Sequence, residues 1–179
     1  MVEIRFAGFG GQGIIRSGII LGQAVSIYDE KFATMNQSFG PEARGGACSA
    51  QVVLSESKIL YPYVTKTDYL VAMSQDAYNT FEPELKDEGI LIIDSDLVKT
   101  HTQKKIYEIA STRMAEELGN KITANVVMLG FFTAISKVVS KDAMVKSVPA
   151  SVPGRFKELN LNAFFKGYDW GEKQLAEGN

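Results

Sequence analysis

A short apolar run that ends in a cluster of glycines constrains this chain more than any other feature of its sequence. Residues 4–7 form the run, and an apolar-striped segment starts at Ile14. The G-x-G-x-x-G spacing between them predicts a buried strand, a tight turn and the N-terminus of a helix. Such a turn lets the backbone approach a phosphate and direct free N–H groups towards it. The residues of the predicted turn are Gly8, Gly10, Gly11, Gln12 and Gly13.

Strand-like runs alternate with helical patterns along the rest of the chain, which predicts a single three-layer α/β/α domain over residues 1–179. A hairpin between residues 47–54 and 58–61 would make the mostly parallel sheet mixed. The remaining predicted strands are 3–8, 31–35, 69–73, 90–93 and 106–109, and the predicted helices are 12–28, 75–85, 111–118, 123–139 and 158–167. Residues 36–46 are assigned to a loop, and residues 149–179 to a C-terminal linker and helix.

Several single residues carry local predictions. Gly18 and Gly22 lie one turn apart on the first helix, which indicates close packing of that helix against the sheet. Gly89 is expected just after the end of the second helix. Ser111 or Thr112 is expected to cap the third helix.

The composition is that of an ordinary globular protein, with 45% hydrophobic and 22% charged residues and a net charge of −2. Because acidic and basic residues are interspersed, we expect no nucleic-acid partner. The longest uncharged apolar run, residues 122–136, falls short of the about 20 residues that a membrane span needs. With a strand beginning directly after Met1, we expect no membrane association and a cytoplasmic protein. Cys48 and His101 are the only residues of their types, so we expect no metal site.

One hypothesis is an autonomous dinucleotide-binding oxidoreductase with a nicotinamide or flavin cofactor. Such folds place an acidic residue about 20 residues after the glycines, at the end of the second strand. Here that strand ends at residues 34–36, whereas Asp29 and Glu30 precede it, and no basic residue replaces the acid. The glycines alone are equally consistent with a tight strand–helix turn that binds nothing.

A second distinctive stretch, residues 38–46, reads Ser-Phe-Gly-Pro-Glu-Ala-Arg-Gly-Gly. Together with residues 8–13 it resembles the gamma subunit of the 2-oxoacid:ferredoxin oxidoreductases. The resemblance continues through residues 125–130 and 167–168, so it covers almost the whole chain. Within the family, residues 40–47 are most similar to the 2-oxoglutarate enzymes.

The resemblance implies a subunit without catalytic residues of its own. Its complex would oxidatively decarboxylate a 2-oxoacid with coenzyme A (CoA), forming acyl-CoA, CO2 and reduced ferredoxin. Thiamine diphosphate, Mg and iron-sulfur clusters would belong to the sister alpha, beta and ferredoxin-like delta subunits. The absence of a Gly-Asp-Gly with a paired Asn, and of cysteine runs, agrees with this division.

For this chain the resemblance implies a subunit interface and a CoA contact. The predicted cofactor-binding residues are Gly8, Gly10, Gly11, Gln12, Gly13, Ser38 and Arg44. The residues assigned to an interface or to loop ordering are Gly40, Glu42, Gly45 and Gly46. Arg44 has two interpretations, a contact to CoA or a contact to a sister subunit, and Gln12 binds a ligand or only fixes the turn.

Three further features have structural interpretations that compete with functional ones. Cys48 is expected to be a small packed residue near a strand start. Residues 94–96, Asp-Ser-Asp, are expected to form a turn and a helix cap rather than a metal site. The aromatic residues near the C-terminus cover either the core or a subunit interface, and they are Phe164, Phe165, Tyr168 and Trp170.

Overall fold

The structure, a computed structural model, describes residues 1–39 and 46–178. Six strands form one sheet in the order β2-β3-β1-β4-β5-β6. Strand β3 is antiparallel to both of its neighbours, and the pairs β1–β4, β4–β5 and β5–β6 are parallel. The mixed α/β fold is therefore confirmed. The strands are β1 (Val2–Phe9), β2 (Phe32–Phe39), β3 (Ala47–Ser55), β4 (Thr67–Ala72), β5 (Leu85–Asp94) and β6 (Lys105–Ile109).

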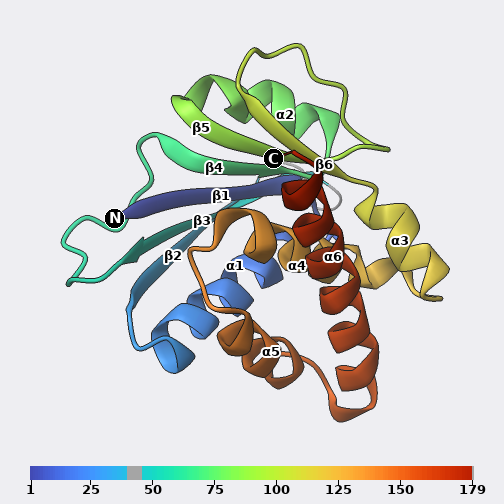
Figure 1. Cartoon of the computed structure of the whole chain (residues 1–179). Coiled ribbons are helices and arrows are strands. Elements are labelled where there is room, and N and C mark those ends of the chain that lie inside the picture. The colour runs from blue at the N-terminus through green and yellow to red at the C-terminus, as the bar shows by residue number, and fades with distance from the viewer. Residues whose placement is uncertain (40–45, 179) are drawn as a thin grey trace.

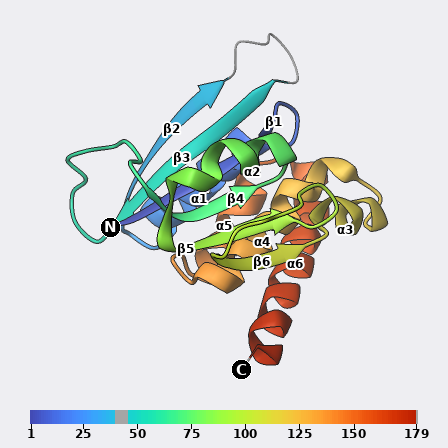
Figure 2. The ribbon, with the colours of Figure 1, turned by 90° about the horizontal axis from the view of Figure 1, so that it is seen from above.

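The two faces of the sheet are covered unequally. Helix α2 packs on one face, over β1 and β4, while α1, α4, α5 and α6 lie on the other (Figures 1 and 2). The helices are α1 (Ile14–Gln23), α2 (Gln75–Phe81), α3 (Ser111–Glu117), α4 (Ala124–Ser136), α5 (Lys141–Ala150) and α6 (Lys157–Glu177). A π-helical segment, Ala24–Tyr28, extends α1. Because β2 and β1 both run antiparallel to β3, their carboxyl ends emerge at the same edge of the sheet.

Strand β1 shows how the alternation of side chains divides the core. Ile4 and Phe6 belong to the larger apolar cluster, and Ala7 belongs to the smaller cluster beneath α2. Arg5 is only 5% exposed, and its Nη2 lies 2.6 Å from Glu84 Oε2. Burial lowers the pKa of Arg5, and the Glu84 carboxylate opposes that shift. The pair fixes the segment after α2 to the central strand.

Helices α4 and α6 cross with their backbones in contact. A Cβ added to Gly130 would overlap with the carbonyl oxygen of Phe164, and one added to Gly167 would overlap with that of Val127. Both segments with a family resemblance at this end of the chain, residues 125–130 and 167–168, are thus explained in part by packing. Of the C-terminal aromatic residues, Phe164 is fully buried, whereas Trp170 is 38% exposed. Phe165 and Tyr168 are half-buried against the core, so most of this aromatic surface covers the protein's own interior.

The predicted hairpin at residues 58–61 is wrong. These residues form no strand, and β3 pairs instead with β2, in a register that matches Phe39 with Cys48. Residues 36–39, which the sequence analysis assigned to a loop, complete β2. The connection from β3 to β4 contacts β2 through Asn36, whose Nδ2 donates to the Pro62 carbonyl at 2.7 Å. Pro62 itself lacks the N–H that a paired strand needs.

Three local predictions also need correction. Gly89 lies inside β5 rather than after a helix, because α2 ends at Phe81 and a 3₁₀ turn over Glu82–Glu84 follows it. A Cβ added to Gly22 would have no neighbour within 4 Å, so Gly22 is not closely packed. A Cβ added to Gly18 would lie only 2.8 Å from the Ala50 side chain, so Gly18 does pack closely. Helix α5 was not predicted, because Pro149 lies in its last turn.

The cap of α3 comes from a different residue than predicted. Asp94, at the end of β5, accepts hydrogen bonds from the Thr112 backbone N–H at 2.9 Å and from the Ser111 hydroxyl at 2.6 Å. The Thr112 hydroxyl donates to the same oxygen at 2.8 Å. Ser111 and Thr112 are therefore donors in the first turn and not the cap. The interpretation of Asp94 as a helix cap is confirmed.

Candidate functional site

The turn between β1 and α1 is held by the Gln12 side chain. Its Oε1 accepts from the Phe9 N–H at 2.7 Å, and its Nε2 donates to the Met73 carbonyl, just beyond β4, at 2.8 Å. The Gly10 N–H donates to the Gly46 carbonyl at 2.9 Å. Gln12 thus links the turn to the neighbouring strand, which favours the interpretation that it fixes the turn.

The glycines of the turn have different physical reasons to be glycine. Gly11 and Gly13 have φ values of +97° and +75°, a conformation that other residues adopt only with strain. A Cβ at Gly8 would overlap with the Gln12 side chain, and one at Gly13 would lie 2.6 Å from Asn125. The backbone shape of the turn therefore excludes side chains at these positions.

The N-terminus of α1 has no side-chain cap. Gly13 precedes the helix, and its carbonyl accepts from the Ser17 N–H at 2.9 Å and from Asn125 Nδ2 at 3.3 Å. Within the described part of the chain, no acceptor pairs with the backbone N–H groups of Ile14 and Ile15. Unpaired N–H groups and the helix dipole favour an anion at this position.

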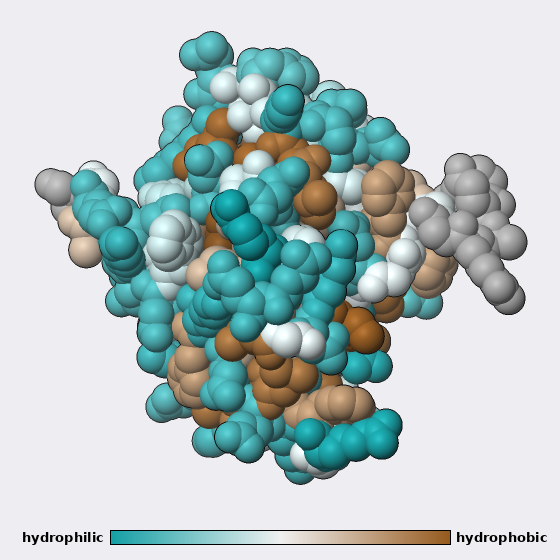
Figure 3. Space-filling model, turned by 90° about the vertical axis from the view of Figure 1, so that its right-hand side faces the viewer, coloured by the Kyte–Doolittle hydropathy of each residue, from teal (hydrophilic) through white to brown (hydrophobic). Residues whose placement is uncertain are grey.

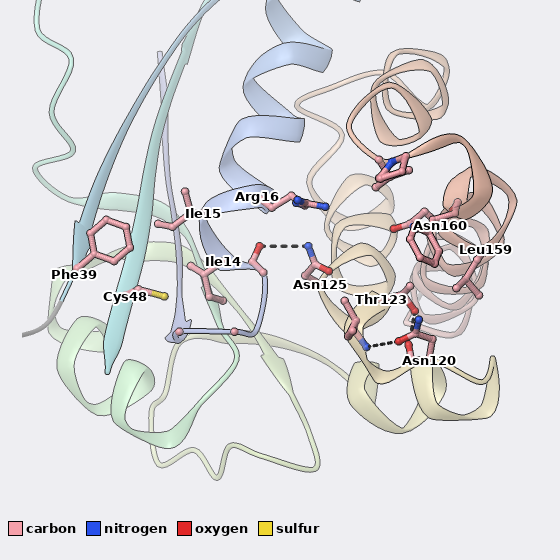
Figure 4. A pocket seen from close by; sticks show the side chains of 17 residues that line it. Ile14, Ile15, Arg16, Phe39, Cys48, Asn120, Thr123, Asn125, Leu159 and Asn160 are labelled. Carbon is pink, nitrogen blue, oxygen red and sulfur yellow. Dashed lines mark hydrogen bonds between the residues drawn. The ribbon is translucent and has the colours of Figure 1, made fainter. Parts of the chain in front are cut away.

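These N–H groups lie beside a cavity of about 540 Å³ (Figure 4). Its walls come from the glycine turn and the first turn of α1, the carboxyl end of β2, the amino end of β3, the residues before and at the start of α4, and the segment that leads into α6. The volume is within the range of pockets that hold a cofactor or a small ligand. The lining residues are Gly10, Gly11, Gly13, Ile14, Ile15, Arg16, Phe39, Cys48, Asn120, Ile122, Thr123, Asn125, Val152, Pro153, Phe156, Leu159 and Asn160.

The cavity combines apolar walls with positive charge. Phe39 and Ile122 are 64% and 78% exposed, and apolar residues interrupt the hydrophilic surface at this end of the molecule (Figure 3). Arg16 extends from the first turn of α1, and among the described residues it has no ion-pair partner. The Arg155 guanidinium lies 4.7 Å from the ring centre of Phe156. An anion with an apolar part would find complementary groups here.

Cys48 is packed at the inner wall of the cavity. The side chain is 7% exposed, and burial raises the pKa of its thiol. The thiol therefore stays protonated at neutral pH, which disfavours a nucleophilic role. The prediction of a small packed residue near a strand start is confirmed.

The structure brings together part of the predicted site. Gly8, Gly10, Gly11, Gln12 and Gly13 form the turn, and Gly46 contacts it through its carbonyl. Ser38 is exposed near the end of β2, but it is not a lining residue of the cavity, because the adjacent Phe39 takes that face. Gly40, Glu42, Arg44 and Gly45 lie outside the described residues. The cofactor-binding role of each residue stays a prediction.

The predicted site did not include five polar residues that line this cavity, namely Arg16, Asn120, Thr123, Asn125 and Asn160. Arg16 follows Gly13 by three residues, which places it in the first turn of the predicted helix. Asn125 is an amide inside an otherwise apolar helical segment, and that contrast was a readable signal. Asn160 had no such signal, because its position depends on how α6 packs.

The described residues contain no group of three or more His, Cys, Asp or Glu residues that would hold a metal ion. Across the same residues, no helix has the length and apolar character needed to cross a membrane. The chemistry visible at the candidate site is that of anion and apolar-group binding.

Comparisons with known proteins agree with this reading of the fold. Residues 3–170 match the family model of pyruvate ferredoxin/flavodoxin oxidoreductase. The chain is 48% identical to the 2-oxoglutarate synthase subunit KorC of Methanocaldococcus jannaschii, over 93% of this chain and 92% of that protein. The crystal structure of the keto/oxoacid ferredoxin oxidoreductase gamma subunit from Geobacter sulfurreducens superposes with a TM-score of 0.86 at 40% identity, covering 96% of this chain and 98% of that chain.

A second similar structure supports the fold alone, because its sequence identity is 24%. It is the 2-oxoglutarate:ferredoxin oxidoreductase from Magnetococcus marinus with 2-oxoglutarate, coenzyme A and succinyl-CoA bound. The superposition has a TM-score of 0.83 and covers 99% of this chain but 31% of that longer chain. From the family match and the two closer similarities it follows that this chain belongs to the pyruvate ferredoxin/flavodoxin oxidoreductase family, as a gamma subunit of a 2-oxoacid:ferredoxin oxidoreductase.

Proposed function

We propose that this chain is the gamma subunit of an oxidoreductase that acts on 2-oxoglutarate. The assembled enzyme would oxidatively decarboxylate this 2-oxoacid with CoA and pass the electrons to ferredoxin. Support comes from the 48% identity to a 2-oxoglutarate synthase subunit over nearly the whole of both chains. An autonomous dinucleotide enzyme is disfavoured, because β3 separates β2 from β1 and, among the residues that the structure describes, no acidic residue lies at the carboxyl end of β2.

The partners in this proposal are the alpha, beta and ferredoxin-like delta subunits of the same cytoplasmic enzyme. Thiamine diphosphate, Mg and the iron-sulfur clusters would be bound by those subunits. This chain would supply an interface and a CoA contact. Gly40, Glu42, Gly45 and Gly46 would order the loop or the interface, with Arg44 contacting CoA or a sister subunit.

The main support for a CoA contact is the N-terminus of α1, which has no side-chain cap and lies beside the cavity. CoA contains a pyrophosphate and a 3′-phosphate, and both need positive potential and N–H donors. Gly11 and Gly13 place no side chain of their own between the cavity and the N–H groups of Ile14 and Ile15. Arg16 adds a guanidinium, whose planar donors suit a phosphate. The residues present therefore fit the nucleotide part of CoA.

Co-purification tests the subunit assignment. The chain, tagged and expressed with the neighbouring genes of its source, should bring down a thiamine-binding subunit and a cluster-binding subunit in fixed ratio. The complex should reduce ferredoxin with 2-oxoglutarate and CoA. A chain that purifies alone and retains a nicotinamide or flavin would contradict the assignment.

Steady-state kinetics of the assembled complex tests the CoA contact. We expect Arg16→Ala to raise KM for CoA about fivefold with little change in kcat, since one exposed charge contact contributes about 1 kcal/mol. Arg44→Ala should raise KM similarly if Arg44 contacts CoA, and should instead weaken assembly if it contacts a subunit. Arg113→Ala is the matched control, because Arg113 pairs with Asp96 away from the cavity lining. An unchanged KM in both variants would remove the CoA contact from the proposal.

A further inference from the structure

The two edge strands of the sheet differ in how they are protected from other chains. Strand β6, at one edge, has only five residues, and Lys105 and Glu108 among them are charged. The Glu108 carbonyl also accepts from Gln174 Nε2 of α6 at 2.8 Å. Short length, charge and a covering element prevent an edge strand from pairing with a further strand. Strand β6 is therefore unsuited to such pairing.

Strand β2, at the opposite edge, is longer and carries no charge (Figure 2). Its eight residues, Phe32–Phe39, include no charged residue and no proline. Lys31, just before the strand, is paired with Glu56 at 2.7 Å. Within the described part of the chain, β3 is the only strand that pairs with β2, and no backbone group outside the sheet bonds to it. An uncharged edge of this length is a site where a further strand can add.

The middle of β2 carries a side chain with an unused acceptor. Asn36 Nδ2 donates to the Pro62 carbonyl at 2.7 Å, and because a carbonyl only accepts, this bond fixes which end of the amide is nitrogen. No described residue donates to Asn36 Oδ1, and this oxygen is not sealed from solvent. The second hydrogen of Nδ2 has no acceptor among the same residues. An amide with one available donor and one available acceptor is complementary to a copy of itself.

Symmetry limits how a second copy of the chain could add to this edge. In an antiparallel pair, opposite residues point to the same face of the sheet, so a two-fold axis must pass between one residue of β2 and its own copy. An axis at Asn36 places the two amides opposite each other. The same axis places Phe39, which is 64% exposed, opposite Ala33 of the second copy. An axis at Met35 would instead place Phe39 opposite Lys31, so the axis at Asn36 is favoured.

We propose that two copies of this chain associate by antiparallel pairing of their β2 strands, with the two-fold axis at Asn36. The two sheets then form one continuous sheet, in which each Asn36 Nδ2 donates to the Oδ1 of its copy. The connections that carry Tyr61 and Tyr63 approach the axis from both copies, because Pro62 is bonded to Asn36. Since these tyrosines are 58% and 54% exposed, pairing would cover aromatic surface. This association does not depend on the CoA contact.

Sedimentation equilibrium of the full chain tests this association. We expect a monomer–dimer equilibrium with a Kd on the order of 10 μM, because one strand pair and its flanks lie at the low end of interface sizes. Gln37→Lys, at an exposed position of β2, should raise Kd about tenfold or more, since an edge lysine opposes strand pairing. Asn36→Lys should raise Kd further, because two like charges would face each other at the axis. Asn162→Lys, at an exposed position on α6, is the matched control and should leave Kd unchanged.

Disulfide cross-linking tests the position of the axis. Asn36→Cys places two thiols opposite each other, with Cβ atoms about 4.5–5.5 Å apart, so mild oxidation should give a covalent dimer. Ser38→Cys, on the same face, should cross-link about tenfold more slowly or less, because it faces Thr34 of the second copy. Equal rates for the two variants would overturn the axis at Asn36.

Two outcomes of sedimentation would overturn the association itself. One is a wild-type chain that stays monomeric well above the expected Kd, as it would if β2 pairs with a sister subunit instead. The other is a dimer that neither lysine substitution in β2 weakens, because that dimer would form through another surface. The wild-type measurement needs no variant, so it holds even if Asn36→Lys unfolds, which thermal melting would reveal.

Discussion

The glycine turn before α1 and the crossing of α4 with α6 both depend on glycine, but for opposite reasons. At the turn, Gly11 and Gly13 adopt positive φ values and leave N–H groups facing a cavity. At the crossing, Gly130 and Gly167 remove the Cβ atoms that would keep two helix backbones apart. At the turn, glycine keeps N–H groups accessible from the cavity, whereas at the crossing it lets the backbones of α4 and α6 come into contact.

The two glycine-containing stretches that carry the family resemblance have different structural roles. Residues 8–13 and residues 125–130 both contributed to the family resemblance. The first stretch shapes the candidate site, whereas Gly130 in the second serves packing. Asn125 connects the two regions, since it lies on α4 and donates to Gly13. Substitutions at the two regions should therefore affect stability and ligand binding in different proportions.

The largest effect is expected for Gly167→Ala at the crossing. The added Cβ would overlap with the Val127 carbonyl, so α6 must move away from α4, at a cost of about 3 kcal/mol or more in the free energy of unfolding. Urea denaturation followed by circular dichroism measures this loss. Gly171→Ala, on the same helix, is the comparison variant: its Cβ would lie 2.6 Å from Ala134 Cβ and 3.3 Å from the nearest backbone atom, the Phe131 carbonyl oxygen, so the overlap is milder and it should cost less. Equal, small losses in both variants would mean that the helices do not touch through their backbones.

A smaller effect is expected at the turn, where two glycines can be compared. Gly11→Ala adds strain alone, because nothing lies within 4 Å of the new Cβ, and it should cost about 1 kcal/mol. Gly13→Ala adds the same strain and also crowds Asn125, so its cost should reach about 2 kcal/mol or more. The same denaturation assay ranks them. If Gly11→Ala proved the more damaging of the two, the described contact with Asn125 would be wrong.

The smallest effect has the opposite sign. Gly22 lies in α1 with open space around it, so Gly22→Ala should raise the free energy of unfolding by about 0.5–1 kcal/mol through helix propensity. CoA binding should not change, since Gly22 is not among the residues that line the cavity. A destabilised Gly22→Ala would show instead that the first prediction, close packing of Gly22, was correct.

Much of the fold was predictable because its signals are local. The apolar runs that became β1, β4, β5 and β6 are short and bounded by turns, and the apolar segment of α4 is continuous. The glycine spacing predicted the position of the turn. Each of these patterns is contained within about 20 residues, so no knowledge of distant contacts was needed.

The missed features depend on contacts between separate elements of the chain. Strand β2 contains Asn36, Gln37 and Ser38, which have low strand propensity, and its pairing with β3 overrides that propensity. The cap of α3 comes from Asp94, which belongs to another element and precedes Thr112 by 18 residues. The cavity likewise joins residues from five separate segments. Periodicity carries no information about such partners.

The π-helical segment Ala24–Tyr28 at the end of α1 has a consequence for insertions and deletions. A π turn closes its hydrogen bond over one more residue than an α turn, as the Asp29 N–H does with the Ala24 carbonyl. The segment therefore holds a spare residue, and losing one there would let the helix end as an ordinary α-helix. In the interior of α4, the same loss would rotate every following side chain by a large angle and misalign the buried face. We therefore expect single-residue insertions and deletions to be tolerated best in the π-helical segment that precedes β2.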